Sequence, residues 1–180
     1  MPLSIIILAA GQGKRMRSAL PKVLHPIAHK PLLAHVYAVA SEFADADIHV
    51  VYGHGGEQVP SALSELDVTW TEQAEQLGTG HAVAQAKEAL KGFAGDVLML
   101  LGDAPFIKTQ TMQDMLDRLR SPDAPAVVVL GFEPDDPLQY GRVITHADST
   151  IEKMVEFKDA NEAERACRLC NSGLMAARAE

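Results

Sequence analysis

Apolar runs of strand length alternate with segments of helical periodicity along most of the chain. The runs Ser4–Ala10 and Val97–Leu101 are apolar at nearly every position, which is typical of strands buried on both faces of a sheet. Pro31–Phe43 and Thr109–Arg120 instead repeat apolar residues at the spacing of a helix. This alternation predicts an α/β fold with a Rossmann-like, mostly parallel sheet flanked by helices. Further strands are expected at 48–52, 68–70 and 126–132, and further helices at 58–66 and 79–90.

After about residue 133 the pattern changes to short strands. Gly141–Thr145 and Ile151–Phe157 are expected to form a hairpin around the turn at 147–149, followed by a polar helix at 161–168. We therefore expect a small β-rich part in this region. The whole chain of 180 residues has the length of one domain, or most of one.

Composition excludes several classes of function. A net charge of −8 argues against electrostatic binding of nucleic acid, so any polyanion must be held by a local cluster of cations. No apolar run reaches the roughly 20 residues of a membrane span, and the N-terminal sequence lacks the basic region of a secretory signal. We therefore expect a cytoplasmic protein without membrane contact, in which Cys167 and Cys170 are two reduced structural thiols.

The first expected strand runs directly into a glycine-containing basic segment. Gly11 and Gly13 would let a ligand approach the backbone, whose N–H groups can bind phosphate oxygens. Four cations follow within nine residues: Lys14, Arg15, Arg17 and Lys22. This reversal of charge in an acidic chain indicates a polyphosphate site, although a glycine turn with a solvated basic loop remains an alternative. The segment lacks a Walker motif, and Met16 stands where a dinucleotide fingerprint needs its third glycine.

Two further segments carry candidate ligand-binding groups. Asp103 follows a buried strand in Leu101-Gly102-Asp103 and could bind Mg²⁺, or could merely cap a turn or helix. The Gln73 amide offers a donor and an acceptor, which suits the edge of a nucleobase. Gly78 would allow close backbone contact nearby. Thr79 could bind the same ligand or serve as a helix N-cap, and His81 is interpreted as a structural residue of the first helical turn.

A third, dispersed set lies in the β-rich part. Gly141, Glu156 and Asn171 supply an exposed glycine backbone, an acid and an amide, which together suit sugar hydroxyls. Each segment by itself is equally typical of a turn or a surface charge cluster. The chain has no Ser-His-Asp or Cys-His pattern that would indicate a catalytic nucleophile.

Together these motifs resemble the sugar-nucleotide pyrophosphorylase family. The resemblance rests on 8–11 with Arg15 and Met16, on 20–22, on Gln73 with 79–81, and on 102–105. The segments 51–56, 75–81 and 140–142 resemble most the bacterial bifunctional N-acetylglucosamine-1-phosphate uridyltransferase / glucosamine-1-phosphate acetyltransferase family. The resemblance covers essentially the whole chain, in order, and implies the nucleotide-diphospho-sugar transferase fold.

The resemblance implies an activity and its ligands. UTP and N-acetylglucosamine 1-phosphate would give UDP-N-acetylglucosamine and pyrophosphate with Mg²⁺ as cofactor, for peptidoglycan and lipopolysaccharide synthesis. It implies uridine contacts from Leu8, Ala9, Ala10, Gly11, Gln73, Gly78 and Thr79. It implies phosphate contacts and catalytic roles for Arg15 and Lys22, and further substrate contacts from Leu101, Gly102 and Asp103, with Asp103 as the Mg²⁺ ligand. It implies amino-sugar contacts from Gly141, Glu156 and Asn171.

The resemblance also implies what a longer protein of this family would contain. Residues 1–180 would be an uridyltransferase domain that is incomplete at its C-terminus, where the family has a second Mg²⁺ ligand. The family adds a left-handed β-helix for acetyl transfer, through which the full-length protein forms a homotrimer. The 180-residue chain would then be a monomer or weak oligomer that binds uridine nucleotide but turns it over poorly.

The chain departs from the family pattern at three positions. Lys14 stands where the family often has Thr, Leu101 where it often has Tyr, and Ser172 where it usually has Thr. Two alternatives stay open: a uridylyl- or thymidylyltransferase for another sugar 1-phosphate, and a non-catalytic module that binds nucleotide sugars.

Overall fold

The computed structural model describes residues 1–11, 13, 16–53 and 55–179. The chain divides into two compact units. The first comprises Met1–Val128 and the C-terminal residues from Met175, and the second comprises Val129–Leu174. Each unit is described below by itself. No helix within the described residues is long and apolar enough to cross a membrane.

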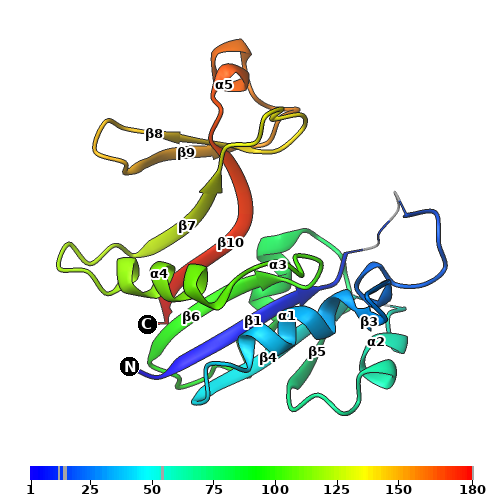
Figure 1. Ribbon diagram of the computed structural model, residues 1–180. Helices are drawn as coiled ribbons and strands as arrows, with labels where there is room; N and C mark the ends of the chain where they lie inside the picture. Colours follow the sequence, from blue (N-terminus) through cyan, green and yellow to red (C-terminus); the bar gives the residue numbers. More distant parts are fainter. Residues whose placement is uncertain (12, 14–15, 54, 180) are drawn as a thin grey trace. The chain divides into compact units, whose positions relative to one another are not determined.

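The sheet of the first unit is mostly parallel, as the sequence predicts (Figure 1). Its strands lie in the order β5-β4-β1-β6-β10, and the pairs β4–β5, β1–β4 and β1–β6 are parallel. Residues Met175–Ala179 of β10 pair with β6 in the antiparallel direction. The bounds are β1 Leu3–Ala9, β4 Ala46–Gly53, β5 Thr69–Gln73, β6 Gly95–Leu101 and β10 Cys170–Ala179.

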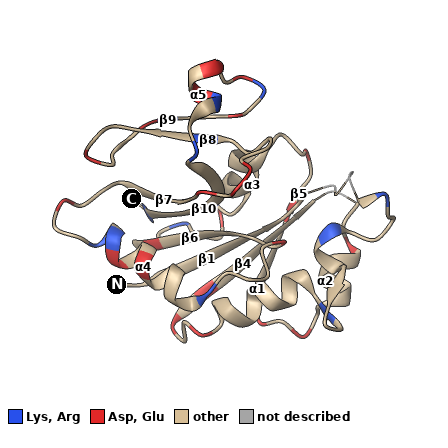
Figure 2. Cartoon of the chain, turned by 45° about the horizontal axis from the view of Figure 1, so that its top comes forward, with Lys and Arg blue, Asp and Glu red and all other residues tan. Residues whose placement is uncertain are grey.

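Strand β1 is the centre of the core. All seven of its residues are buried, and none is charged, so the strand is entirely tan in Figure 2. Its apolar side chains alternate between the two faces of the sheet. On one face, Ile6 and Leu8 pack with Val51, Ala82 and Ala86 against helix α3.

Helices α1 and α4 supply further buried residues of the first unit and contact β1 and β6, respectively. Leu33 and Val36 of α1 and Met112 and Leu116 of α4 are almost fully buried. The helical elements of this unit are η2 Lys22–Leu24, α1 Leu32–Ala40, α2 Gln58–Ala62, α3 Thr79–Gln85 and α4 Thr109–Leu119. A short antiparallel pair, β2 Pro26–Ile27 and β3 Lys30–Pro31, precedes α1.

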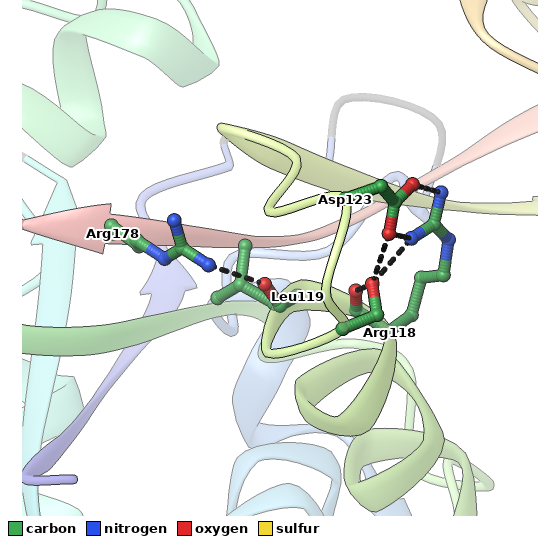
Figure 3. A network of polar contacts seen from close by, with 5 residues as sticks. Arg118, Leu119, Asp123 and Arg178 are labelled. Carbon is green, nitrogen blue, oxygen red and sulfur yellow. Dashed lines mark hydrogen bonds and ion pairs between the residues drawn. The ribbon is translucent and has the colours of Figure 1, made fainter.

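Polar contacts stabilise the C-terminal end of α4. Arg118 forms an ion pair with Asp123, and Arg178 of β10 donates to the Leu119 carbonyl at 2.8 Å (Figure 3). The guanidinium of Arg118 and the hydroxyl of Ser121 hold the pKa of Asp123 well below its usual range. These contacts join the end of the helix to the following turn and to β10.

The second unit is β-rich, and it begins a few residues before the expected position. Strands β8 Arg142–Thr145 and β9 Ile151–Val155 form the expected antiparallel hairpin. Its turn is stabilised by the Asp148 carboxylate, which accepts from the Thr150 N–H and hydroxyl. The polar helix α5, Glu162–Ala166, starts with a reciprocal capping box between Asn161 and Glu164. Strand β7, Val127–Phe132, enters this unit, and the Ser172 hydroxyl of β10 donates to the Leu130 carbonyl.

Several expected boundaries are wrong. The helix expected at 58–66 ends at Ala62, and the one expected at 79–90 ends at Gln85. After Gln85 the backbone bonds from Ala86 and Lys87 reach back only three residues, so the helix gives way to turns. Strand β5 extends to Gln73, three residues beyond the expected end. The chain's two cysteines are free thiols, as expected.

His49 of β4 makes the first unit sensitive to acid. The side chain is 6% exposed, and its Nδ1 has no hydrogen-bond partner among the described residues. Burial lowers the pKa of His49, and the nearby Asp47 charge only partly opposes this. The folded state therefore binds a proton less readily than the unfolded state, so stability is full above the unfolded pKa and falls as the pH drops below it.

We expect urea midpoints of the wild type to fall between pH 8 and pH 5. His49→Leu should reduce that fall, whereas His146→Leu, an exposed change in the second unit, should not. Equal pH dependence in the wild type and His49→Leu would contradict the assignment.

Candidate nucleotide site

The carboxyl ends of the parallel strands bring the first group of predicted residues to one edge of the sheet. Leu8 of β1 lies opposite Leu101 of β6, and the Gly102 N–H donates to the Leu8 carbonyl at 2.9 Å. A Cβ on Gly102 would lie 3.2 Å from that carbonyl oxygen and 3.3 Å from side-chain carbons of Leu33 and Val23. Glycine is needed here because β1, η2 and α1 all approach its backbone closely.

A second close approach joins three segments beside the loop that follows β1. The Gln76 amide, from the β5–α3 loop, donates to the Ala10 carbonyl at 3.0 Å. A Cβ on Gly53, the last residue of β4, would collide with Gln76 Nε2 and lie 2.8 Å from the Ala10 oxygen. The Gln76 side chain therefore connects the β5–α3 loop to the start of the glycine-containing loop after β1. It occupies space that is open because Gly53 has no side chain.

Gly53→Ala is expected to damage this junction. The added methyl group has backbone on one side and the Gln76 amide on the other, so either the bridge to Ala10 breaks or β4 shifts. We expect a loss of about 1–3 kcal/mol in the free energy of unfolding. Urea denaturation measures it, and Gly80→Ala is the control because a Cβ there meets nothing within 4 Å. Equal stability of the two variants would contradict the crowding at Gly53.

Gln73 ends β5 and is 2% exposed. Its Nε2 donates to the Gly78 carbonyl at 3.2 Å and lies 3.0 Å from His81 Nδ1. Gly78 has a φ of 105° and occupies the N-cap position of α3, so Thr79 is the first helical residue and is not the cap. The alternative role of Thr79 as an N-cap is therefore wrong.

Lys22 and Asp103 meet at the same edge. The Lys22 ammonium forms an ion pair with the Asp103 carboxylate, and both side chains are partly exposed. A Cβ on Gly13 would lie 2.9 Å from Lys22 Cβ, so the described part of the glycine-containing loop lies against the same lysine. A cation, a carboxylate and glycine backbone are thus grouped where β1 and β6 end.

The donor set fits Mg²⁺ of the kind that phosphate substrates carry. The described residues contain no group of three or more His, Cys, Asp or Glu that could hold a metal ion. Mg²⁺ in phosphate-transfer sites needs only one or two carboxylates, with substrate oxygens and water completing its coordination. The Asp103 carboxylate can be one such ligand, and Lys22 balances its charge in the structure described here.

The predicted sugar residues converge within the second unit. The Asn171 N–H donates to the Gly141 carbonyl at 2.9 Å, and a Cβ on Gly141 would lie 3.6 Å from Glu156 Oε1. Arg142 is 2% exposed and donates to the Pro137, Leu138 and Tyr140 carbonyls, which fixes the turn before Gly141. The backbones of Gly141 and Asn171 and the Glu156 carboxylate therefore lie close together, and the Asn171 side-chain oxygen accepts from the Gly173 N–H at 2.9 Å.

The predicted residues are thus divided between the two units. Leu8, Ala9, Ala10, Gly11, Lys22, Gln73, Gly78, Thr79, Leu101, Gly102 and Asp103 belong to the first unit. Lys14 and Arg15 lie outside the described residues. Arg15 is one of the two residues expected to be catalytic, the other being Lys22. Sequence reasoning did not assign Gln76 to the site and gave His81 only a structural role. Both residues lie in the segment 75–81, which the sequence analysis noted. Their hydrogen-bond partners, however, depend on how the loop between β5 and α3 folds.

Comparison with known proteins agrees with this architecture. Residues 5–169 match the family model described as the MobA-like NTP transferase domain. The chain belongs to this family. Similar curated proteins include the Bifunctional protein GlmU of Sphingopyxis alaskensis, 61% identical over 181 residues, and that of Zymomonas mobilis subsp. mobilis, 52% identical over 180 residues. Each match spans 99% of this chain but only 39% and 40% of the relative, so the chain covers about two fifths of their length.

Solved structures confirm the expected fold. A UDP-glucose pyrophosphorylase complexed with UDP-glucose has a TM-score of 0.72 at 18% identity, over 98% of this chain and 76% of that one. A glucose-1-phosphate thymidylyltransferase from Bacillus anthracis, described as putative, has a TM-score of 0.75 at 20% identity, over 98% and 71%. At these identities the likeness establishes the nucleotide-diphospho-sugar transferase fold alone.

Proposed function

We propose that the chain carries the uridylyl-transfer site of an enzyme that makes UDP-N-acetylglucosamine and pyrophosphate from UTP and N-acetylglucosamine 1-phosphate. The observation that supports this most is the grouping of Gln73, Lys22 and Asp103 at the carboxyl edge of a parallel sheet. Ligands of such sheets bind at this edge. The likeness to the Bifunctional protein GlmU over nearly the whole chain adds support.

The chemistry demands positioning more than proton transfer. The nucleophile is already a phosphate oxygen of the sugar phosphate, which attacks the α-phosphorus of UTP in line with the departing pyrophosphate. No strong general base is therefore needed, and the main requirement is to bring two polyanions together and neutralise their charge. Lys22 can bind phosphate oxygens through its ammonium, and Arg15 is proposed from the sequence as the second cation.

Mg²⁺, when bound, would offset phosphate charge and orient the oxygens of the triphosphate. Asp103 would hold it through its carboxylate, two residues after the end of β6. Lys22 would then exchange its present ion pair with Asp103 for contact with a phosphate group. Backbone N–H groups around Gly11 would provide neutral donors to the same substrate.

The amino sugar would bind through the second unit. Glu156 would accept hydrogen bonds from sugar hydroxyls, and the Asn171 amide could both donate and accept. Two other functions remain candidates: transfer to another sugar 1-phosphate, and nucleotide-sugar binding without catalysis. Acetyl transfer, trimer formation, a cytoplasmic location and a role in peptidoglycan and lipopolysaccharide synthesis are proposals for a full-length protein.

Glu156→Gln should weaken binding of the sugar phosphate and leave binding of UTP unchanged. The change keeps the size of the side chain but removes the negative charge that strengthens hydrogen bonds from sugar hydroxyls. We expect KM for N-acetylglucosamine 1-phosphate to rise about 10-fold, with KM for UTP unchanged. Asp159→Asn, an exposed change in the same unit, is the control. A rise in KM for UTP, or none for the sugar phosphate, would remove Glu156 from the sugar site.

The test of the proposed function is pyrophosphate release by the purified chain with Mg²⁺. UTP, CTP and dTTP are each combined with N-acetylglucosamine 1-phosphate, glucosamine 1-phosphate and glucose 1-phosphate. Preferential release with UTP and N-acetylglucosamine 1-phosphate supports the proposal. Preference for another sugar phosphate supports the sister enzyme, and saturable UTP binding without release from any pair supports the binding module.

A further inference from the structure

Arg142 lies next to all three residues that are predicted to contact the amino sugar, namely Gly141, Glu156 and Asn171. It is the first residue of β8 and directly follows the glycine of that group. Strand β8 lies between β9 and β10, and Arg142 is paired with Val155 on one side and with Cys170 on the other. The residues that follow these two partners are Glu156 and Asn171. One residue is thereby adjacent, along the chain or across the sheet, to every segment of the predicted sugar site.

The Arg142 guanidinium is buried without an acidic partner. The residue is 2% exposed, and it forms no ion pair within the part of the chain that the structure describes. The guanidinium lies 5.5 Å from the centre of the Phe157 ring, and its terminal nitrogens donate to three carbonyls, those of Pro137, Leu138 and Tyr140. A buried charge adds little net stability, because the loss of its hydration offsets its contacts. These contacts therefore bear on the geometry of the turn at 137–140 more than on the free energy of unfolding.

The turn that Arg142 contacts has a strained backbone. Leu138 has a φ of 41°, in the left-handed region that bulky L side chains rarely adopt. Two contacts support this conformation: Arg142 donates to the Leu138 carbonyl at 3.3 Å, and the Asp136 carboxylate accepts from the Leu138 N–H at 3.0 Å. The Leu138 residue is 62% exposed, so its own packing does not offset the strain. Strained backbone persists where its surroundings enforce it, and it is concentrated at functional sites.

We infer that Arg142 is a positioning residue of the sugar site, which keeps the turn at 137–140 in the strained form that places the Gly141 backbone beside Glu156. The inference rests on the proposed function, because it takes Gly141 and Glu156 as groups that meet the amino sugar. Gly141 directly follows the turn, and a Cβ on it would lie 3.6 Å from Glu156 Oε1, so a shift of the turn would separate these two groups. The guanidinium also lies over the ring of Phe157, the residue after Glu156, and therefore acts on both sides of this contact.

The test compares equilibrium binding of UDP-N-acetylglucosamine and of UTP to the chain, by titration calorimetry with Mg²⁺. Arg142→Met retains an unbranched side chain but removes every donor to the turn. The apparent affinity for a ligand falls with the fraction of molecules whose site has the binding geometry. We therefore expect Kd for UDP-N-acetylglucosamine to rise about 10-fold, with Kd for UTP unchanged because UTP carries no amino sugar.

Arg168→Met is the matched control. Arg168 is an exposed arginine of the same unit, and it donates to the Pro134 carbonyl at 2.7 Å, before the strained turn begins. The variant loses the same charge and also a bond from a guanidinium to a loop carbonyl. Its Kd for both ligands should equal that of the wild type.

Relief of the strain separates positioning from a general loss of structure. Glycine adopts a positive φ as readily as a negative one, so Leu138→Gly added to Arg142→Met should let the turn form without the guanidinium. We expect the double variant to bind UDP-N-acetylglucosamine about threefold more tightly than Arg142→Met. Arg142→Lys keeps the charge near Phe157, but its single ammonium cannot reproduce the fork of a guanidinium, and it should raise this Kd about threefold. Arg142→Lys takes the place of Arg142→Met throughout if circular dichroism shows the latter to be unfolded.

The possible results distinguish the inference from the proposed function. A rise in Kd confined to UDP-N-acetylglucosamine, with recovery on adding Leu138→Gly, supports the inference. An unchanged Kd in the Arg142 variants, an equal loss of UTP binding, or no recovery with Leu138→Gly would overturn the inference and leave the proposed function standing. Binding of neither ligand by the wild type would contradict the proposed function and the inference together.

Discussion

Asp103→Asn should reduce the rate of pyrophosphate release at least about 100-fold at the wild-type optimum of Mg²⁺. The variant keeps the shape of the side chain but loses the charge that attracts a divalent cation and pairs with Lys22. Because Asp103 lies two residues after the end of β6, the change should leave the buried strand intact. Initial rates across a Mg²⁺ titration measure both the loss of rate and any shift toward higher Mg²⁺.

The control for this prediction is Asp123→Asn, which also removes one acidic charge from the first unit. Asp123 is paired with Arg118 after α4 and has no expected part in phosphate binding. Its titration should follow that of the wild type. If Asp103→Asn showed the same Mg²⁺ requirement and rate as the wild type, Asp103 could not be a metal ligand.

Arg120→Ala should lower the free energy of unfolding by about 2–3 kcal/mol. Asp96, at the start of β6, is fully buried and pairs with Arg120 Nε at 2.6 Å. Its other oxygen, Oδ1, has no hydrogen-bond partner among the described residues. Removing the cation would leave a buried carboxylate uncompensated, which costs about 3–5 kcal/mol where both groups are buried. We expect a smaller loss, about 2–3 kcal/mol, because the Arg120 side chain is partly exposed and water screens its charge.

A double-mutant comparison separates this cost from lost packing. Asp96→Asn combined with Arg120→Ala should be more stable than Arg120→Ala alone, because no charge is then left buried. Arg118→Ala, which breaks an exposed pair on the same helix, should change the urea midpoint little. A double variant no more stable than Arg120→Ala would show that the ion pair itself contributes little.

The parallel part of the fold could be predicted from the sequence because its strands are buried on both faces. Runs such as Ser4–Ala10 and Val97–Leu101 leave few alternatives, and the glycines after them mark where the chain turns at the sheet edge. The grouping of Leu8, Gln73 and Asp103 follows from this topology, since parallel strands end together. The prediction that Gly141, Glu156 and Asn171 lie close together rested on the family resemblance, because their spacing in the sequence does not indicate it.

Other features depend on contacts between distant segments, which local patterns do not encode. The antiparallel strand β10 pairs with β6 through Met175–Ala179, although its residues continue a chain otherwise expected to add parallel strands. The bridge from Gln76 to Ala10 spans 66 positions and requires the space left by Gly53. The shortened helix α3 reflects turn geometry after Gln85, which apolar spacing alone does not reveal.

Titration calorimetry of the chain with UDP-N-acetylglucosamine tests the central claim most directly, because it needs binding but no turnover. The account predicts saturable binding at one site, which Gln73→Ala weakens at least about 10-fold. The control is His35→Phe, a change on α1 at a ring that bonds the Ile27 carbonyl, and it should leave binding unchanged. No saturable heat with the wild type, or equal affinity in Gln73→Ala, would contradict a uridine site at the carboxyl edge of this sheet.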